Sequence, residues 1–247
     1  MFPLHPSQLS SPEQLLEWAI RSFRSRFAVL TSFQKSGMVT VDMAAKIEPS
    51  VRVITLDTGR LPEETYRMME MIREHYGIQV EMVASDAAEV EQMQRRYGPN
   101  LFYRDPALRR LCCEVRKVRP QRRKLAELDA YAVGLRRAQT ESRSATLQAV
   151  QVEGRWKLSP LAEWSNAQVN EYLRRNGVPE HPLYAAGYTS IGCGPCTRAV
   201  ADGEEERSGR WWWEQDAAKE CGLHVTADGV VARKLDVLLG ELVSARA

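Results

Sequence analysis

Apolar and polar positions follow two different periods along the first half of the chain. Short apolar runs rich in β-branched residues predict buried strands, and longer segments between them predict helices. The predicted strands are Phe27–Thr31, Val51–Leu56, Ile78–Val83 and Ala130–Leu135. The predicted helices are Met38–Ile47, Pro62–His75 and Asp86–Tyr97, the second with a proline at its first position.

This alternation predicts the α/β fold class, in which helices sandwich a mainly parallel sheet. Ligands of such sheets bind beyond the carboxyl ends of the strands. We therefore expect the ligand site at the three loops that follow predicted strands, namely Thr31–Gly37, Asp57–Arg60 and Gly134–Gln139.

The second half of the chain is less regular. A helix is predicted over Asn166–Arg175, closed by Asn176-Gly177, and an amphipathic helix runs from about Val230 to the end. We expect one domain over 1–247, with an α/β core over about 20–200 and a mobile C-terminal segment over about 201–247. The three tryptophans at 211–213 are expected to anchor that segment to the core; stacking on adenine or docking a protein are the alternatives.

Charge and composition exclude several classes of function. The chain has 34 Lys and Arg against 32 Asp and Glu, so its formal net charge is +2. This balance indicates neither nucleic acid nor membrane as a partner, and anion binding must come from local clusters. No apolar run approaches the roughly 18 residues of a membrane span, and Met1–Ser11 lacks the pattern of a secretory signal. We expect a cytoplasmic protein.

Four of the five cysteines form two pairs. Cys112 and Cys113 are adjacent, and Cys193 and Cys196 form a C-x-x-C motif in a loop rich in glycine and proline, which is a common metal-ligand geometry. The pairs could hold a 4Fe–4S cluster, hold zinc, or be small buried residues. Adjacent cysteines favour the cluster over a single tetrahedral zinc ion, although by a small margin.

The fifth cysteine, Cys221, stands alone near the end of the chain. A thiol must ionise before it can act as a nucleophile, and the neighbouring Lys219 and His224 could lower its pKa. A surface thiol without a role is the alternative that the local sequence leaves open.

Taken together, these motifs resemble the sulfonucleotide reductases, in the branch that reduces adenosine 5′-phosphosulfate. The resemblance covers about residues 30–224. It rests on SF at 32–33, LDTGRLPEETY at 56–66, CCEVRKVRP at 112–120, GLRRAQTESR at 134–143, SPLAEW at 159–164, HPLYAAGYTSIGCGPCTRA at 181–199, ERSGRWWWE at 206–214 and KECGLH at 219–224. The ordered set of CC, C-x-x-C and ECGLH is its most specific part.

The resemblance implies a fold like that of the adenine-nucleotide alpha hydrolases and a 4Fe–4S cluster on Cys112, Cys113, Cys193 and Cys196. It implies Cys221 as the nucleophile, with thioredoxin as electron donor. In the reaction, the Cys221 thiolate attacks the sulfate sulfur and expels AMP, and thioredoxin then releases sulfite from the enzyme thiosulfonate. We also expect a homo-oligomer.

The resemblance also assigns residues to the site. Lys117 follows Cys113 by four residues, so on a helix it faces the same side as this ligand, and it is expected between cluster and substrate. His224 is expected to meet the nucleophile or the substrate. The expected substrate-binding residues are Ser32, Lys35, Leu56, Asp57, Thr58, Gly134, Arg136, Arg137, Arg207 and Arg210. By contrast, we expect Arg122, Arg123 and Lys124 to lie on a solvated helix face.

Two departures from the related reductases leave alternatives open. The loop after the first strand reads Ser32-Phe33-Gln34-Lys35-Ser36-Gly37 and lacks the early glycine of its relatives, so Lys35 and Ser36 are its candidates for holding phosphate. Residues 230–247 extend the chain, and we expect them to cover the site or to join subunits. Reduction of the 3′-phosphorylated nucleotide or of both nucleotides, an iron–sulfur RNA thiolation enzyme, and a zinc-binding module are the competing functions.

Overall fold

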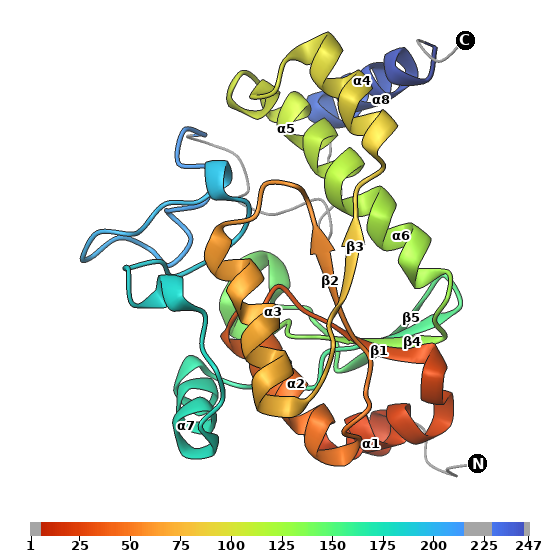
Figure 1. Cartoon of the computed structure of the whole chain (residues 1–247), viewed down its shortest axis with the longest axis vertical. Helices are drawn as coiled ribbons and strands as arrows, with labels where there is room; N and C mark the ends of the chain where they lie inside the picture. The colour runs from red at the N-terminus through yellow and green to blue at the C-terminus, as the bar shows by residue number, and fades with distance from the viewer. Residues whose placement is uncertain (1–5, 215–228, 245–247) are drawn as a thin grey trace.

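A six-stranded sheet forms the centre of the molecule (Figure 1). The structure is a computed structural model that describes residues 6–214 and 229–244. The strands are β1 Phe27–Leu30, β2 Val53–Asp57, β3 Glu81–Ala84, β4 Ala130–Val133, β5 Ala149–Val152 and β6 Arg155–Leu158. Their order is β3-β2-β1-β4-β6-β5, and all neighbours are parallel except β5 and β6, which confirms the predicted fold class.

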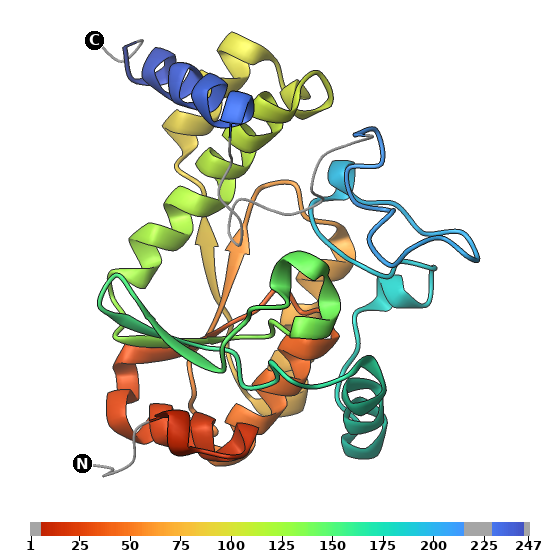
Figure 2. The ribbon, with the colours of Figure 1, turned by 180° about the vertical axis from the view of Figure 1, so that it is seen from behind.

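The helices follow the predicted order, with additions. They are α1 Pro12–Phe23, α2 Lys35–Ile47, α3 Glu63–Tyr76, α4 Ala87–Tyr97, α5 Pro106–Cys113, α6 Arg119–Leu125, α7 Asn166–Asn176 and α8 Gly229–Ser244. A π-helical turn, Glu114–Val118, joins α5 to α6. Helix α1 and the β5–β6 hairpin, which forms the sheet edge opposite β3 (Figure 2), have no counterpart among the predicted elements.

Side chains of β1 alternate between two apolar layers. Phe27 and Val29 lie in the larger core with residues of α1, α2, α3 and α7. Ala28 lies in the opposite layer, which Leu125 of α6 helps to cover. This alternation is what a strand buried on both faces requires. Every helix within 6–214 and 229–244 is too short or too polar to cross a bilayer.

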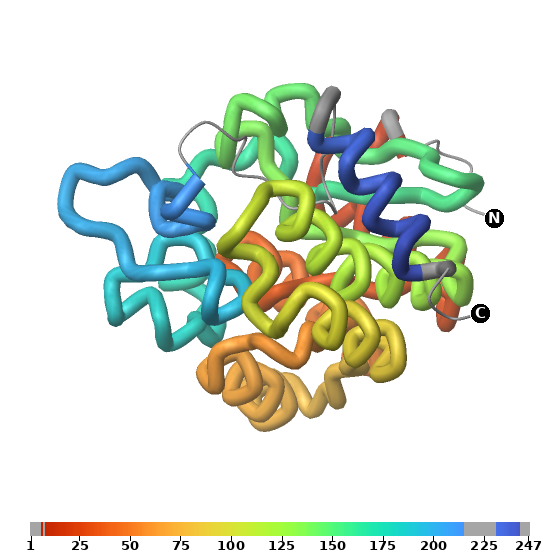
Figure 3. Tube along the Cα trace, turned by 90° about the horizontal axis from the view of Figure 1, so that it is seen from above, coloured from red at the N-terminus to blue at the C-terminus, as the bar shows by residue number. Residues whose placement is uncertain are grey.

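A third apolar cluster lies beyond the sheet, where α4, α5 and α8 pack together (Figure 3). Lys234 of α8 pairs with Asp105, the N-cap residue of α5, at 2.5 Å, and Gln92 of α4 donates to the Leu242 carbonyl at 2.6 Å. The predicted C-terminal helix is thus confirmed, but the residues that line the two cavities described below do not include it.

Candidate active site

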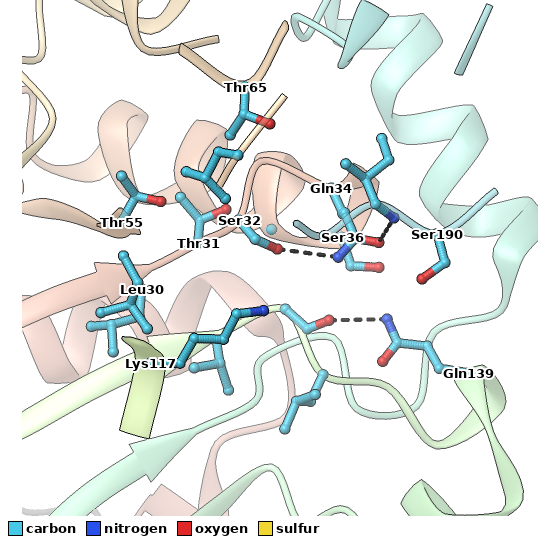
Figure 4. Close-up of a pocket in the computed structure, with 18 of the residues that line it drawn as sticks. Leu30, Thr31, Ser32, Gln34, Ser36, Thr55, Thr65, Lys117, Gln139 and Ser190 are labelled. Carbon is cyan, nitrogen blue, oxygen red and sulfur yellow. Dashed lines mark hydrogen bonds between the residues drawn. The ribbon is translucent and has the colours of Figure 1, made fainter. Parts of the chain in front are cut away.

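A cavity of about 220 Å³ lies beyond the carboxyl ends of β1, β2 and β4. Residues of all three predicted loops line it, together with Ser190, Ile191, Gly192, Glu206, Arg207 and Arg210. Figure 4 labels Ser32, Gln139 and Ser190 among the lining residues. Strands β1 and β4 are in register from Phe27 opposite Ala130 to Leu30 opposite Val133, so the loops after them begin side by side. The chain continues from β1 to β2 on one side and returns to β4 on the other, which makes this a topological switch point. We refer to this cavity as the anion pocket.

Two glycines allow the loops after β1 and β4 to touch. A Cβ atom on Gly134 would lie 2.5 Å from the backbone nitrogen of Gly37, and a Cβ atom on Gly37 would overlap Oγ1 of Thr31. Both glycines line the pocket. Because neither position has room for a side chain, the backbone of the first turn of α2 can border the pocket, where helix N–H groups favour anions.

Arg136 and Arg137 are adjacent in sequence but lie in different surroundings. Arg136 is 4% exposed and donates from Nε to Oγ of Ser36 at 2.8 Å and from a terminal nitrogen to the Trp164 carbonyl at 2.8 Å. Burial lowers the pKa of its guanidinium. The side chain of Arg137 is 43% exposed and lies 3.4 Å from Glu163. Neither of these arginines is among the residues that line the pocket.

Four basic side chains do line the anion pocket: Lys117, Arg143, Arg207 and Arg210. Of these, sequence reasoning missed Arg143, although it ends the quoted segment 134–143. Arg143 donates to Oε1 of Gln139 at 2.6 Å, and Gln139 donates to the Gly134 carbonyl at 3.2 Å. Arg207 donates to Oγ of Ser190 at 3.3 Å. Glu206 is the acidic side chain on the same wall, so positive charge prevails and an anionic ligand is favoured.

The remaining substrate-binding candidates divide into two groups. Ser32, Leu56, Thr58 and Gly134 line the pocket. Lys35 instead donates from Nζ to Asn170 at 2.9 Å and lies 3.4 Å from Glu180, so its charge is directed to α7 and the loop after it. Asp57 accepts bonds from the Gly59 N–H at 2.7 Å and the Tyr66 hydroxyl at 2.9 Å, which makes it a residue that shapes the turn.

A second cavity, of about 20 Å³, brings the four paired cysteines together. Cys112, Cys113, Cys193 and Cys196 line it with five basic residues: Arg60, Arg109, Arg116, Lys117 and Arg210. Lys117 and Arg210 line both cavities. We refer to this space as the cysteine cavity.

The chemistry of this cavity fits a sulfur-rich anionic cluster. The buried Arg116 Nε and Trp211 Nε1 have no hydrogen-bond partner within 6–214 and 229–244, and both residues line the cavity. Two N–H donors next to four thiols suit acceptors such as thiolate or sulfide sulfur. Thr58 adds a contact of 3.2 Å between its Oγ1 and Sγ of Cys193. Within 6–214 and 229–244, no group of three or more His, Cys, Asp or Glu side chains is arranged to hold a metal ion.

The thiols of Cys112 and Cys196 resist ionisation by themselves. Burial raises the pKa of Cys196 to about 12, with a further rise from Cys193, whereas Lys117 and Arg210 lower it. Burial also raises the pKa of Cys112, against the charges of Arg116, Lys117 and Arg60. Ligation requires thiolates, so a bound metal centre must displace these protons, and the surrounding cations reduce the cost.

Lys117 and Cys113 both line the cysteine cavity. The prediction placed them on the same side of a helix because they are four residues apart. In the structure α5 ends at Cys113, and Lys117 lies in the π-helical turn Glu114–Val118, where each turn contains more residues. Arg116 also lines the cavity and donates to the Thr58 carbonyl at 2.5 Å. The π-helical turn thus directs two consecutive basic residues toward the cysteines.

The first tryptophan anchors residues 211–214 to α5, as expected. Trp211 is 1% exposed and lies between two guanidinium groups, 4.4 Å from that of Arg109 and 4.6 Å from that of Arg210. Arg109 also pairs with Glu214 through two hydrogen bonds, at 2.5 and 2.9 Å. Trp212 is 40% exposed, and none of the three tryptophans lines the anion pocket. Cys221 and His224 lie outside the described residues.

Fold and site together define an α/β protein with an anion pocket at a topological switch point, beside a cavity of four cysteines. Residues 26–199 match the family model of the phosphoadenosine phosphosulfate reductase domain. The chain is 40% identical over 222 residues to adenosine 5′-phosphosulfate reductase of Allochromatium vinosum, covering 89% of this chain and 86% of the relative. It is 44% identical over 178 residues to the Burkholderia cepacia protein of the same name, covering 71% of each. The chain therefore belongs to the phosphoadenosine phosphosulfate reductase domain family.

Solved structures agree with this assignment. The phosphoadenylyl-sulfate reductase of Candida auris, solved as a phosphate complex, superposes with a TM-score of 0.66 and 26% identity, covering 81% of this chain and 98% of that one. Yeast FAD synthetase superposes with a TM-score of 0.51 at 12% identity, covering 76% of this chain and 66% of that one, and shares the fold alone.

Proposed function

We propose that the chain is an adenylyl-sulfate reductase, an oxidoreductase that converts adenosine 5′-phosphosulfate to sulfite and AMP in assimilatory sulfate reduction, with thioredoxin as electron donor. The observation that carries this proposal is that Lys117 and Arg210 line both the anion pocket and the cysteine cavity. Bacterial relatives at 40% and 44% identity bear the name of this activity.

The anion pocket is proposed to hold the nucleotide with its phosphate and sulfate toward the basic wall. Lys117, Arg143, Arg207 and Arg210 offset the two negative charges of the substrate, which would otherwise repel an approaching thiolate. The small and apolar residues at the strand ends, such as Leu30, leave room for a flat base.

Cys112, Cys113, Cys193 and Cys196 would hold the 4Fe–4S cluster. When bound, it supplies a fixed charge distribution next to the pocket, and the cysteine and the dithiol donor already account for both electrons. Arg116 and Trp211 would donate hydrogen bonds to sulfur. Lys117 lines both cavities, so its position and charge in the anion pocket would depend on the charge of the cluster.

Cys221 is proposed as the nucleophile. Its thiolate attacks the sulfate sulfur, a sulfur–sulfur bond forms, and the bond between sulfur and the phosphate oxygen breaks, so that AMP leaves with the electron pair. One thioredoxin thiolate then attacks Sγ of Cys221 and expels sulfite, and the second resolves the mixed disulfide, leaving oxidised thioredoxin and the Cys221 thiolate. His224 is the proposed contact to the nucleophile or substrate.

The 3′-phosphorylated nucleotide is the second candidate substrate. The likeness to the Candida auris phosphoadenylyl-sulfate reductase supports it, at lower identity than the relatives named for the unphosphorylated nucleotide. A cytoplasmic location, the homo-oligomer and the division of the chain into core and C-terminal segment remain predictions from the sequence.

The test is mass spectrometry of the reduced full-length protein mixed with each nucleotide in the absence of thioredoxin. We expect a sulfonate adduct on the peptide that contains Cys221, formed faster with adenosine 5′-phosphosulfate. Cys221→Ser should abolish the adduct and turnover while leaving iron content and visible absorption intact. Sulfite release at the normal rate by this variant would refute the mechanism, and a colourless protein that contains zinc would refute the cluster.

A further inference from the structure

Gln34 joins the loop after β1 to the loop that carries Cys193 and Cys196. Its Oε1 accepts a hydrogen bond from the backbone N–H of Ile191 at 3.0 Å, and its Nε2 donates to Oγ of Ser32 at 3.1 Å (Figure 4). Gln34 and Ile191 are 157 positions apart in the chain. One side chain therefore bridges the pocket to a loop that is distant in sequence.

The loop that Gln34 holds borders both cavities. Ser190, Ile191 and Gly192 line the anion pocket, and Cys193 begins the cysteine pair that lines the other cavity. Gly192 packs against Arg210 so closely that a Cβ atom there would lie 2.7 Å from Cζ of the guanidinium. A shift of Ile191 would therefore displace both the wall of the anion pocket and Cys193 in the cysteine cavity.

The bond from Gln34 also determines what the Ser32 hydroxyl can do. Its Oγ accepts from the glutamine amide, so the hydroxyl proton remains to be donated. Ser32 lines the anion pocket. A phosphate or sulfate oxygen of a bound nucleotide could accept the hydrogen bond from its hydroxyl. Donation to such an oxygen would polarise and strengthen the chain of bonds from Ser32 through Gln34 to Ile191.

We propose that Gln34 is a positioning residue that couples anion binding in the pocket to the ordering of the cysteine loop. The inference rests on the proposed function, since it takes an adenine nucleotide as the pocket ligand. Coupling of this kind is reciprocal: the nucleotide holds the cysteine loop in place, and a held loop raises nucleotide affinity.

The experiment compares the full-length protein with Gln34→Met, which keeps the side-chain volume and removes both hydrogen bonds. Each protein, kept under anaerobic conditions, is treated with iodoacetamide with and without saturating AMP, and alkylation of the tryptic peptide Asn176–Arg198, which holds Cys193 and Cys196, is followed by mass spectrometry. We expect AMP to slow alkylation about fivefold in the parent protein, the factor that one ordinary hydrogen bond supplies, and to have little effect in Gln34→Met.

Gln151→Met is the matched control, because Gln151 is exposed on β5 and lines neither cavity. It should keep the protection that AMP affords the parent. Calorimetry of AMP binding separates the coupling through Gln34 from the proposed nucleotide-binding function. If AMP binds the parent and protects Gln34→Met equally well, the coupling is overturned and the proposed function stands. If AMP does not bind the parent at all, both are overturned.

Discussion

Arg136 donates a hydrogen bond from its Nε to Oγ of Ser36 across 2.8 Å, and this bond ties the loop after β4 to the first turn of α2. The same guanidinium reaches the Trp164 carbonyl and the side chain of Asn166, at the start of α7. One buried cation thus fastens three segments around the pocket without lining it. Its role in this structure is to position the residues around the pocket.

Replacing Arg136 with Met should therefore weaken folding as well as binding. The change leaves the Trp164 carbonyl and the Asn166 amide without this partner, so we expect a loss of about 1–3 kcal/mol in the free energy of unfolding. AMP affinity should fall with it. Urea denaturation and calorimetry measure the two effects. The neighbouring Arg137→Met, on an exposed side chain, should stay within about 0.5 kcal/mol of the parent. Equal losses of stability and AMP affinity in the two variants would contradict the positioning role of Arg136.

Gly134→Ala should damage the pocket directly. Its new methyl group would meet the backbone of Gly37 at 2.5 Å, and backbone cannot swing aside as a side chain can. Overpacking of this kind costs about 1–3 kcal/mol in the free energy of unfolding. AMP affinity should fall as well, because the two loops that border the pocket would be pushed apart. Gly240→Ala in α8 is the control, because a Cβ atom there meets nothing within 4 Å. It should stabilise the helix by up to about 1 kcal/mol and leave AMP binding unchanged.

Lys117→Ala should slow formation of the Cys221 adduct, since Lys117 lines both cavities and would stabilise charge that develops during attack. Removal of one such donor costs about a hundredfold in rate. Rapid-quench mass spectrometry gives that rate, and iron content should remain that of the parent. Lys124→Ala provides the comparison, because Lys124 pairs with Glu81 at 2.9 Å and with Glu127 at 2.7 Å, and lines neither cavity. An unchanged rate in Lys117→Ala would reject the role.

His181 should make stability depend on pH. It is 1% exposed; its Nδ1 accepts from the Leu183 N–H at 3.3 Å, and its Nε2 lies 3.1 Å from the Thr65 hydroxyl. Burial lowers its pKa to about 4 from the ordinary 6.5. Above pH 6.5 both folded and unfolded chains hold a neutral ring, so the effect is absent. As pH falls from 6.5 toward 4, only the unfolded chain takes up the proton, and stability is lost.

The loss should reach on the order of 3 kcal/mol by pH 4, measured as the change in unfolding free energy from urea titrations. His181→Gln should be less stable than the parent at pH 7 but should show a flatter decline toward acid. His75→Gln, on an exposed side chain of α3, should decline as the parent does. A slope in His181→Gln as steep as that of the parent would show that other groups cause the pH dependence.

The local pattern of the chain was enough to predict most of the sheet. Strands β1, β2 and β4 were found because both of their faces are buried, so their sequences are short apolar runs. The hairpin of β5 and β6 was missed because its strands are partly exposed and polar. Its turn carries positive φ at Glu153 and Gly154, at 51° and 78°, and this Glu-Gly pair was the available signal.

The functional side chains were harder to place. Lys35 has the charge and the position of a phosphate ligand, but Asn170 and Glu180 engage its ammonium group. Arg143 lines the pocket because Gln139 holds it there, although nothing in its immediate sequence separates it from a surface arginine. Helix α2 begins at Lys35, three residues before its predicted start, where the Tyr184 hydroxyl accepts from the Lys35 N–H at 3.1 Å.

The sequence by itself determined the order of β1 to β4 with α2, α3 and α4, the loops that meet at the ligand edge, and the two cysteine pairs as candidate ligands. Periodicity and spacing, which carry these predictions, are properties of neighbouring residues. Only the tertiary structure decided that Lys117 and Arg210 line both cavities, that Arg136 is buried while Arg137 is exposed, and that Gln34 reaches Ile191. These facts depend on which distant segments pack together. A side chain's partner across the fold is set by the packing of whole elements, which no local window of the chain contains.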